Sequence, residues 1–267
     1  MDQRNAVLKL WRGAAAIFLL AAGLTAQTPD EITSLLDGIS GRLKSYADYK
    51  NWTASAVTTI TEMNKDWNPQ KITVITRSVR VKNDEREDDI LQVIETEKGR
   101  TRDITKKYQD ELRERLEKAR KRRTESGKRD GGDGRDRVTI NLEEVLPFGE
   151  KTRSGYDFRL PGGEASSGGR FILLEAKARK PNPKLWNGIY TIDPGTFDIL
   201  RAEVYPSKNP KFVKEMEMSA EVEILDGKYF ALKKVRFRVY GGIFLKRVRM
   251  VVEEEYSDVR ITEDPVS

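Results

Sequence analysis

The feature that most constrains the fold is a long succession of alternating segments in the second half of the chain. From Phe171 onward, apolar and polar residues alternate within each run, and short turn sequences separate the runs. A period of two places successive side chains on opposite faces of a β-strand. Tight turns between such runs join neighbouring strands in antiparallel fashion. The second half is therefore predicted to be an antiparallel sheet.

The segment LWNGIYTIDPGTFDILRAEVYP contains the clearest turn. In its centre, 193–196, proline presets φ, glycine tolerates a positive φ, and aspartate bonds its own downstream backbone. If Asp193 and Thr196 face each other across the turn, Ile192 pairs with Phe197 and Tyr190 pairs with Ile199. Ile189 then lies on the other face. Because both faces carry large apolar side chains, we expect both to be covered, with Tyr190 on the inner one.

A second hairpin is predicted around Asp226-Gly227, a pair that favours a tight primed turn. It joins 216–224 to 229–240. Gly241-Gly242 is predicted to turn the chain into a last strand, 243–256. The alternation places these residues on one face: Met218, Ala220, Val222, Ile224, Tyr229, Ala231, Val235, Phe237 and Val239.

The first half begins with a predicted amphipathic helix over 29–48. Its apolar residues recur at helical spacing, and acidic residues at its start suit the positive end of a helix. Three alternating runs rich in β-branched residues follow at 52–63, 71–81 and 90–97, and we expect antiparallel strands there.

Residues 101–169 form a predicted insertion of different character. Apolar residues recur every third or fourth position through 101–125 within a dense field of charge, which predicts a helix with a narrow apolar stripe. Its end, 118–123, holds five basic residues in six. Such a run suits an anionic membrane surface or polyanion, or simply a solvated helix end whose cations face the negative dipole. The glycine-rich stretches 126–137 and 161–169 are predicted loops.

The N-terminus has the three-part pattern of a secretory signal peptide. Basic residues precede the apolar run 13–24, which is shorter than a comfortable membrane span and ends at small residues. We expect cleavage after Ala26, leaving 27–267 as a single soluble periplasmic domain; an uncleaved anchor is the alternative. No cysteine is available to carry a lipid.

Two absences narrow the function. The chain has no Cys and no His, which excludes thiolate nucleophiles, the usual catalytic triads and nearly all zinc and transition-metal sites. The stretch 131–139 fits one copy of a calcium-binding nonapeptide, but such sites need stacked repeats. We therefore expect no catalytic residues, no metal and no cofactor. The net charge of +6 arises from mixed charges and indicates solubility, so we expect no nucleic-acid partner and a monomer.

The order of elements resembles the lipoprotein-carrier (LolA-like) superfamily. The features that carry the resemblance are the first helix (32–46), the strand pair 52–81, GIYTIDPGTFDILRAEVY (188–205) and FRVYGGIFLKRVRMVVEEEYSDVRI (237–261). The resemblance implies an α+β fold, a strongly curved antiparallel β-sheet or half barrel, with the N-terminal helix and the inserted charged helix packed on or beside it. It also implies a cavity that takes up acyl chains of lipids or lipoproteins.

A cavity lined by aromatic, Met and aliphatic side chains needs no catalytic group to hold an acyl chain. The candidate lining residues, each of which could equally be ordinary core, are Trp52, Trp186, Tyr190, Ile192, Phe197, Ile199, Met216, Met218, Phe237 and Met250. The alternative function is a cell-envelope interaction or sensor protein, with a half barrel filled by its own helices and a basic helix that contacts a partner or an anionic membrane surface. An enzyme using carboxylates alone is the least favoured alternative.

Overall fold

A computed structural model describes residues 29–47, 51–82, 85–125, 146–161, 170–243 and 246–262. The predicted signal peptide, the calcium-type nonapeptide and nearly all of the second glycine-rich loop lie outside the described residues. Neither of the helices described here is long and apolar enough to cross a membrane.

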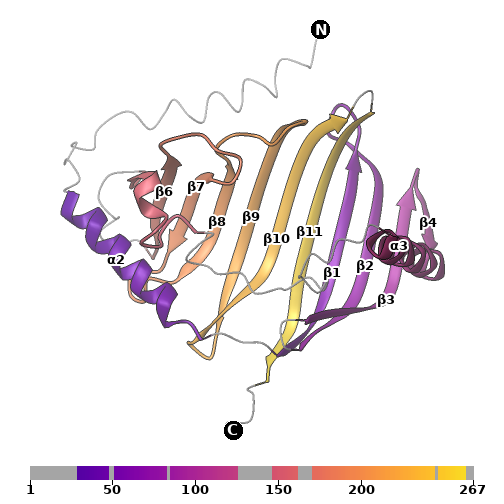
Figure 1. Cartoon of the computed structure of the whole chain (residues 1–267), viewed down its shortest axis with the longest axis horizontal. Helices are drawn as coiled ribbons and strands as arrows, with labels where there is room; N and C mark the ends of the chain where they lie inside the picture. The colour runs from indigo at the N-terminus through magenta and orange to yellow at the C-terminus, as the bar shows by residue number, and fades with distance from the viewer. Residues whose placement is uncertain are drawn as a thin grey trace.

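The described chain forms one sheet of eleven strands with two α-helices (Figure 1). The strands are β1 (Trp52–Met63), β2 (Pro69–Lys82), β3 (Glu85–Glu97), β4 (Arg100–Asp103), β5 (Tyr156–Arg159), β6 (Ile172–Ala178), β7 (Trp186–Ile192), β8 (Ile199–Pro206), β9 (Val213–Leu225), β10 (Tyr229–Ile243) and β11 (Lys246–Ile261). The helices are α2 (Pro29–Ser45) and α3 (Thr105–Glu125), and a short 3-10 turn, η1, spans Arg153–Gly155.

The strand order is β4-β3-β2-β1-β11-β10-β9-β8-β7-β6-β5, and every neighbouring pair is antiparallel. The last strand, β11, pairs with the first, β1, so the two halves of the chain share one continuous sheet. The short strands β4 and β5 form the two edges, and the sheet does not close. The predicted class, α+β with an open, curved antiparallel sheet, is confirmed.

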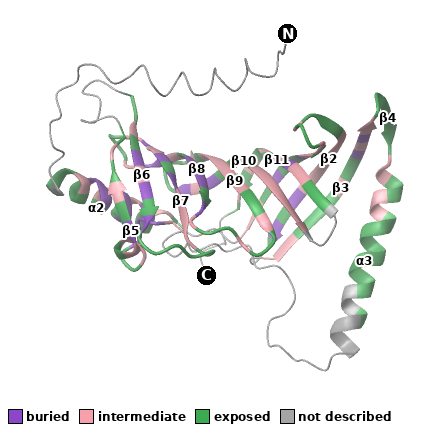
Figure 2. Ribbon diagram, turned by 90° about the horizontal axis from the view of Figure 1, so that it is seen from above, coloured by how far each residue is buried: buried purple, intermediate pink, exposed green. Residues whose placement is uncertain are grey.

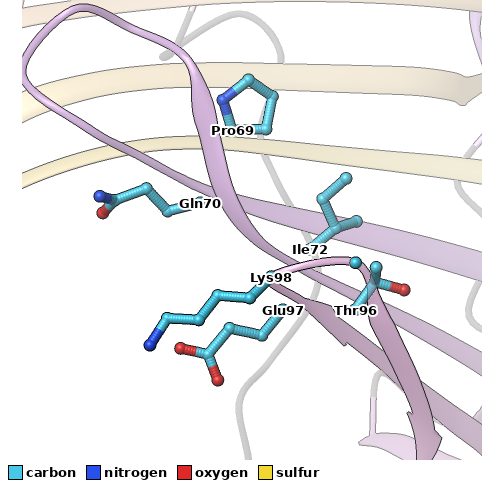
Figure 3. Close-up of a pocket in the computed structure, with 7 residues that line it drawn as sticks. Pro69, Gln70, Ile72, Thr96, Glu97 and Lys98 are labelled. Carbon is cyan, nitrogen blue, oxygen red and sulfur yellow. The ribbon is translucent and has the colours of Figure 1, made fainter.

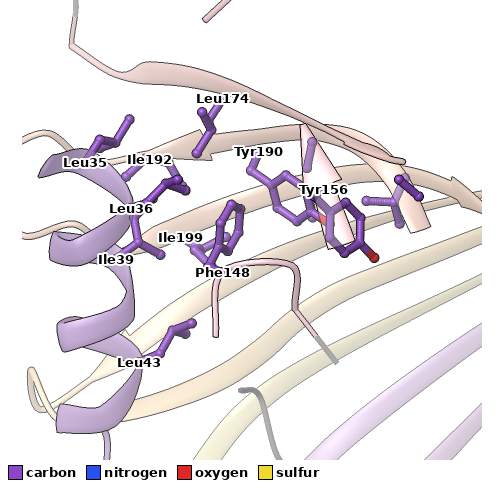
Figure 4. Packing of buried hydrophobic residues seen from close by; sticks show 14 residues of the cluster. Leu35, Leu36, Ile39, Leu43, Phe148, Tyr156, Leu174, Tyr190, Ile192 and Ile199 are labelled. Atoms are coloured by element: carbon purple, nitrogen blue, oxygen red, sulfur yellow. The ribbon is translucent and has the colours of Figure 1, made fainter. Parts of the chain in front are cut away.

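The main hydrophobic core lies at the β5–β8 end of the sheet, under α2 (Figure 4). Leu35, Leu36, Ile39 and Leu43 recur at helical spacing and are buried, as predicted. They pack against alternate residues of β6, β7 and β8, which include the fully buried Leu174, Tyr190, Ile192 and Ile199. We call the face of the sheet that α2 covers the α2 face.

A buried carboxylate fastens α2 to the β7–β8 turn. Asp198 Oδ1 accepts a hydrogen bond from Arg42 Nε at 2.5 Å and one from the Tyr46 hydroxyl at 2.6 Å. Its Oδ2 accepts one from the Thr196 hydroxyl at 2.7 Å. Burial acts to raise the pKa of Asp198, but these donors outweigh it, so the pKa lies below its ordinary value. Arg42 also donates to the carbonyl of Gly227, which ties α2 to the β9–β10 turn.

The predicted register of the β7–β8 hairpin is wrong by two residues at Ile192 and by three at Tyr190, because the pairing shifts between Thr191 and Ile192. Ile192 pairs with Ile199, and Tyr190 pairs with Ala202. Asp193 Oδ1 accepts the N–H groups of Gly195 and Thr196, and the loop continues to Asp198, whose carbonyl accepts the Asp193 N–H. Phe197 takes a positive φ of 61° inside this longer loop and packs on Gly38 of α2, where a Cβ would lie 2.8 Å from its ring.

The faces of this hairpin were predicted correctly, but not their covering. Tyr190, Ile192 and Ile199 lie on the α2 face. On the opposite face Ile189 remains 38% exposed, so that face is not sealed by protein.

The β9–β10 hairpin has the predicted primed turn, with φ of 51° at Asp226 and 68° at Gly227. Two details differ from prediction. An extra residue at position 233 shifts the pairing, so Phe230 and Leu232, not Tyr229 and Ala231, share a face with Val222 and Ile224. Gly241-Gly242 lies within β10 and makes no turn. A Cβ at Gly241 would lie 2.7 Å from the carbonyl oxygen of Phe212, so the glycine permits a close approach of the β8–β9 connection.

The predicted insertion contributes more to the sheet than loops and a helix. Residues 100–103 form the edge strand β4, and 156–159 form the other edge, β5. Phe148, just before β5, is fully buried and contacts Tyr190 with a ring-centroid distance of 4.7 Å. The charged helix α3 begins at β3, where Gln109 donates to the carbonyl of Ile90, and then projects from the sheet (Figure 2).

We expect Asp198→Asn to lower the free energy of unfolding by about 2 kcal/mol, because a buried amide accepts charge-assisted hydrogen bonds less strongly than a carboxylate. Since the folded-state pKa of Asp198 lies below the unfolded value of about 3.9, its stabilisation is present above that value and is lost as pH falls through the folded pKa. Urea unfolding across acidic pH should show a weaker dependence in Asp198→Asn. The exposed control Asp226→Asn should behave like the parent protein.

Candidate functional site

Away from α2, the α2 face of the sheet carries a band of half-buried apolar side chains, which we call the apolar strip. It comprises Met216 and Met218 on β9, Phe237 and Val239 on β10, and Met250 and Val252 on β11. Phe237 lies opposite Met218 and Val252, while Val239 lies opposite Met216 and Met250. Three adjacent strands therefore present one continuous apolar surface.

The register shows that the strip lies on the α2 face. Met218 pairs with Val204, a buried residue of the main core, and itself packs against that core. Residues two apart along a strand share a face, so Met216 follows Met218. The main core is thus one wall of the apolar strip.

The opposite wall is a network of paired charges on β1, β2, β3 and β11. Arg77 contacts Glu254 at 2.7 Å and Asp88 at 3.1 Å, and it donates to the Thr58 hydroxyl at 2.8 Å. Arg86 makes two hydrogen bonds to Asp88, at 2.7 and 3.0 Å, and approaches Glu254 at 3.6 Å. Two arginines thus balance two carboxylates, and this wall contributes no net charge.

Tyr256 completes this network and links it to a small apolar cluster. Its hydroxyl lies 3.4 Å from Arg86 Nη1, and its ring contacts Trp52 edge-on with a centroid distance of 6.2 Å. Burial, with the neighbouring carboxylate of Glu254, raises the pKa of Tyr256 to about 12. The tyrosine is therefore neutral at physiological pH, and its oxygen accepts the hydrogen bond from Arg86.

At the upper end of the sheet in Figure 1, the apolar strip opens into a depression of about 430 Å³. Its floor includes Val213, Val239 and Val248, and Lys211 and Phe212 stand at its margin. Gly241 also lines this depression, and because it has no side chain the Phe212 carbonyl approaches its backbone closely.

A second depression, of about 470 Å³, lies beside the start of β2 and the β3–β4 turn (Figure 3). Ile72 and Thr96, which line it, alternate with Thr73 and Glu95 of the α2 face. This depression therefore belongs to the opposite face and does not continue the apolar strip.

The structure separates the ten candidate lining residues into three groups. Tyr190, Ile192 and Ile199 are 2% exposed or less and fill the core under α2, with Trp186 and Phe197 packed against that core. Trp52 packs in the small cluster beside Tyr256. Four of the candidates lie together in the apolar strip: Met216, Met218, Phe237 and Met250.

Sequence reasoning missed several residues of this surface. Val239 and Val252 lie in the apolar strip, and Phe212 and Val248 border its upper end. The alternation in β10 and β11 placed the two valines on the correct face. A valine in such a pattern cannot be distinguished from an ordinary core residue, so neither was singled out as a candidate. Phe212 lies in a connection without periodicity, so only the register brings it beside Gly241.

No family model matches the sequence, and no curated protein matches it. Several solved structures are similar. A LolA superfamily protein from Nitrosomonas europaea is 11% identical, with a TM-score of 0.34, over 87% of this chain and 94% of that chain. A putative outer membrane lipoprotein-sorting protein domain from Vibrio parahaemolyticus is 12% identical, with a TM-score of 0.35, over 85% and 91%. The MucA/MucB complex of Pseudomonas aeruginosa gives 10% identity and a TM-score of 0.27 over 88% and 100%.

The names of the first two proteins include the superfamily, or the lipoprotein sorting, that the sequence resemblance indicated.

We expect Arg77→Met to destabilise the protein by about 3 kcal/mol, because it leaves the half-buried carboxylate of Glu254 without its closest cation. The double variant Arg77→Met/Glu254→Gln removes that uncompensated charge and should recover part of the loss. Urea unfolding of both variants measures the effect. Simple additivity of the two single substitutions would show that the wall is not a coupled network.

Proposed function

We propose that the protein is a secreted, periplasmic, non-enzymatic binder of acyl chains, carried by lipids or lipoproteins, and that the apolar strip holds them. The observation that supports this proposal is the continuous band of methionine, phenylalanine and valine on three adjacent strands of the α2 face, half-buried beside a fully packed core. The predicted signal peptide and the absence of cysteine support a soluble periplasmic location.

The composition of the strip suits an acyl chain better than a rigid ligand. Methionine is unbranched and polarizable, so Met216, Met218 and Met250 adapt to a chain of variable shape. Each methylene removed from water contributes about 0.8 kcal/mol. The strip therefore supplies affinity without any directed polar contact.

The network of paired charges that forms the opposite wall of the apolar strip suits the same role. The charges of Arg77, Arg86, Asp88 and Glu254 are paired with one another, so an apolar guest beside them does not leave a charge unpaired. The pKa of Tyr256 lies too far from neutrality for a general base. These features favour carriage over chemistry.

We expect Met216→Gln/Met250→Gln to weaken binding of a fluorescent fatty acid at least about tenfold. Glutamine keeps the length of methionine but places a polar amide at the two positions flanking Val239, where an acyl chain offers no hydrogen bond. Fluorescence titration measures the affinity. The control Glu217→Gln adds the same amide on the opposite, exposed face of β9 and should bind like the parent protein.

Lipid extraction and mass spectrometry of the protein purified from its native host test the natural ligand. The proposal expects an acyl-containing lipid that is depleted in the double variant. A clean extract together with no binding of the fatty-acid probe would overturn it.

Helix α3 favours a second candidate function, which is to bind a partner in the cell envelope. This helix projects from the sheet edge, as Figure 2 shows. Two of its leucines are exposed, Leu112 at 37% and Leu116 at 54%. Charged pairs such as Lys118 with Glu114 border this stripe. An apolar stripe with charged flanks on a projecting helix suits packing against a partner helix or groove.

We expect Leu112→Ser/Leu116→Ser to leave folding intact, because these side chains contribute little to the core, and to abolish the partner association if α3 forms the contact. Cross-linking in the native host, followed by purification, measures that association. Lys107→Ser/Arg113→Ser, which changes exposed charges of the same helix, is the matched control. An unchanged set of cross-links in the leucine variant would exclude α3 as the contact.

A further inference from the structure

Three segments meet at the end of the sheet where the apolar strip opens. They are the β6–β7 connection (179–185), the β8–β9 connection (207–212) and the adjoining ends of β10 and β11. The Ser207 N–H donates to the Leu185 carbonyl at 2.7 Å, and the Gly242 N–H donates to the Phe212 carbonyl at 3.0 Å. These bonds join the three segments into one margin, which we call the basic rim.

The basic rim is rich in cations and lacks acidic residues in its sequence. The segments RKPNPKL (179–185), SKNPKFVK (207–214) and KRVR (246–249) contain lysine and arginine but neither aspartate nor glutamate. The turns at the opposite end, DPGTFD (193–198) and DGK (226–228), contain three aspartates and one lysine. These two groups of turns therefore differ in charge.

Most cations of the basic rim are not neutralised by the described residues. Arg179 contacts Asp157 at 2.9 Å. Lys180, Lys184, Lys208 and Lys211 are exposed, and no carboxylate of the described chain lies within ion-pair distance of them. Such cations attract an anionic surface at short range.

Phe212 stands among these cations and is held by its backbone. Its side chain is 55% exposed, while its φ of 71° and the bond from Gly242 fix its position. Asn209 Nδ2 braces the same connection by donating to the Lys214 carbonyl at 2.6 Å. Beside it, Val248 is 41% exposed at the floor of the depression.

A lipid bilayer satisfies both parts of this surface. Lysines suit anionic headgroups, and an exposed phenylalanine gains burial only where an apolar phase lies beneath those headgroups. A nucleic acid or another soluble polyanion would pair with the lysines alone. The depression behind Phe212 leads to the apolar strip, which gives an acyl chain a short path from the bilayer.

We propose that the basic rim docks the protein on an anionic phospholipid bilayer, with Phe212 entering the interface. This deepens the acyl-chain proposal by naming where the chain is collected or delivered. The acyl-chain proposal and the docking proposal can be tested separately, because fatty-acid binding in solution does not require docking and docking does not require the apolar strip.

The test uses the chain from Gln27 onward, which contains every described element and lacks the apolar N-terminal run. Co-sedimentation with phosphatidylcholine vesicles, with and without phosphatidylglycerol, should show binding only to the anionic vesicles and loss of binding at high salt. Lys208→Ser/Lys211→Ser should weaken it about 30-fold. Phe212→Ser should weaken it about tenfold.

The matched control Lys82→Ser/Lys233→Ser removes two exposed lysines outside the basic rim, at the end of β2 and at the extra residue within β10, and should bind like the parent protein. Circular dichroism establishes that each variant is folded. The proposal is overturned by equal binding to neutral vesicles, by no binding to either kind, or by an equal loss in the control. Binding to heparin as tight as to anionic vesicles, with no effect of Phe212→Ser, would show a general polyanion patch and also overturn it.

Discussion

The described structure depends on the packing of helix α2 against the apolar face of an open sheet of eleven strands. Helix α2 covers only the β5–β8 end, and it is fixed there by the buried carboxylate of Asp198, which accepts hydrogen bonds from Arg42, Tyr46 and Thr196. The neighbouring part of that face, on β9, β10 and β11, is left half-buried. A buried charge is stable only when its hydrogen-bond donors stay in place. The hydrogen bonds of Asp198 therefore hold α2 at one position on the sheet, and the edge of α2 sets where the packed core ends and the apolar strip begins.

The side chains on the α2 face change in kind from one end of the sheet to the other. The core under α2 is dry and fully packed around Tyr190 and Ile192. The apolar strip follows, and then the neutral network around Arg77 and Glu254. A surface that is apolar in the middle and bordered by paired charges is suited to hold a flexible apolar guest in one band of the sheet. At one end of that band the basic rim adds the charge that a lipid surface would recognise.

Much of the fold was predictable from local patterns. Period-two alternation identified the strands of the second half, helical spacing identified α2, and Asp226-Gly227 identified its hairpin turn. Predictions failed where single residues act through tertiary contacts. Asp193 lengthens the β7–β8 loop through its own side chain, an extra residue at 233 shifts the pairing of β10, and Gly241 serves a close backbone approach instead of a turn.

The sequence by itself determined the strand segments, the amphipathic helix and the absence of thiol and imidazole chemistry, because these follow from residue type and period. Only the tertiary structure decided which candidates are core and which form a surface. Tyr190 and Met218 have similar patterns, yet one is sealed under α2 and the other lies at its margin. That difference depends on where one helix packs, and the basic rim likewise depends on strand register, which joins segments more than 60 residues apart in the chain.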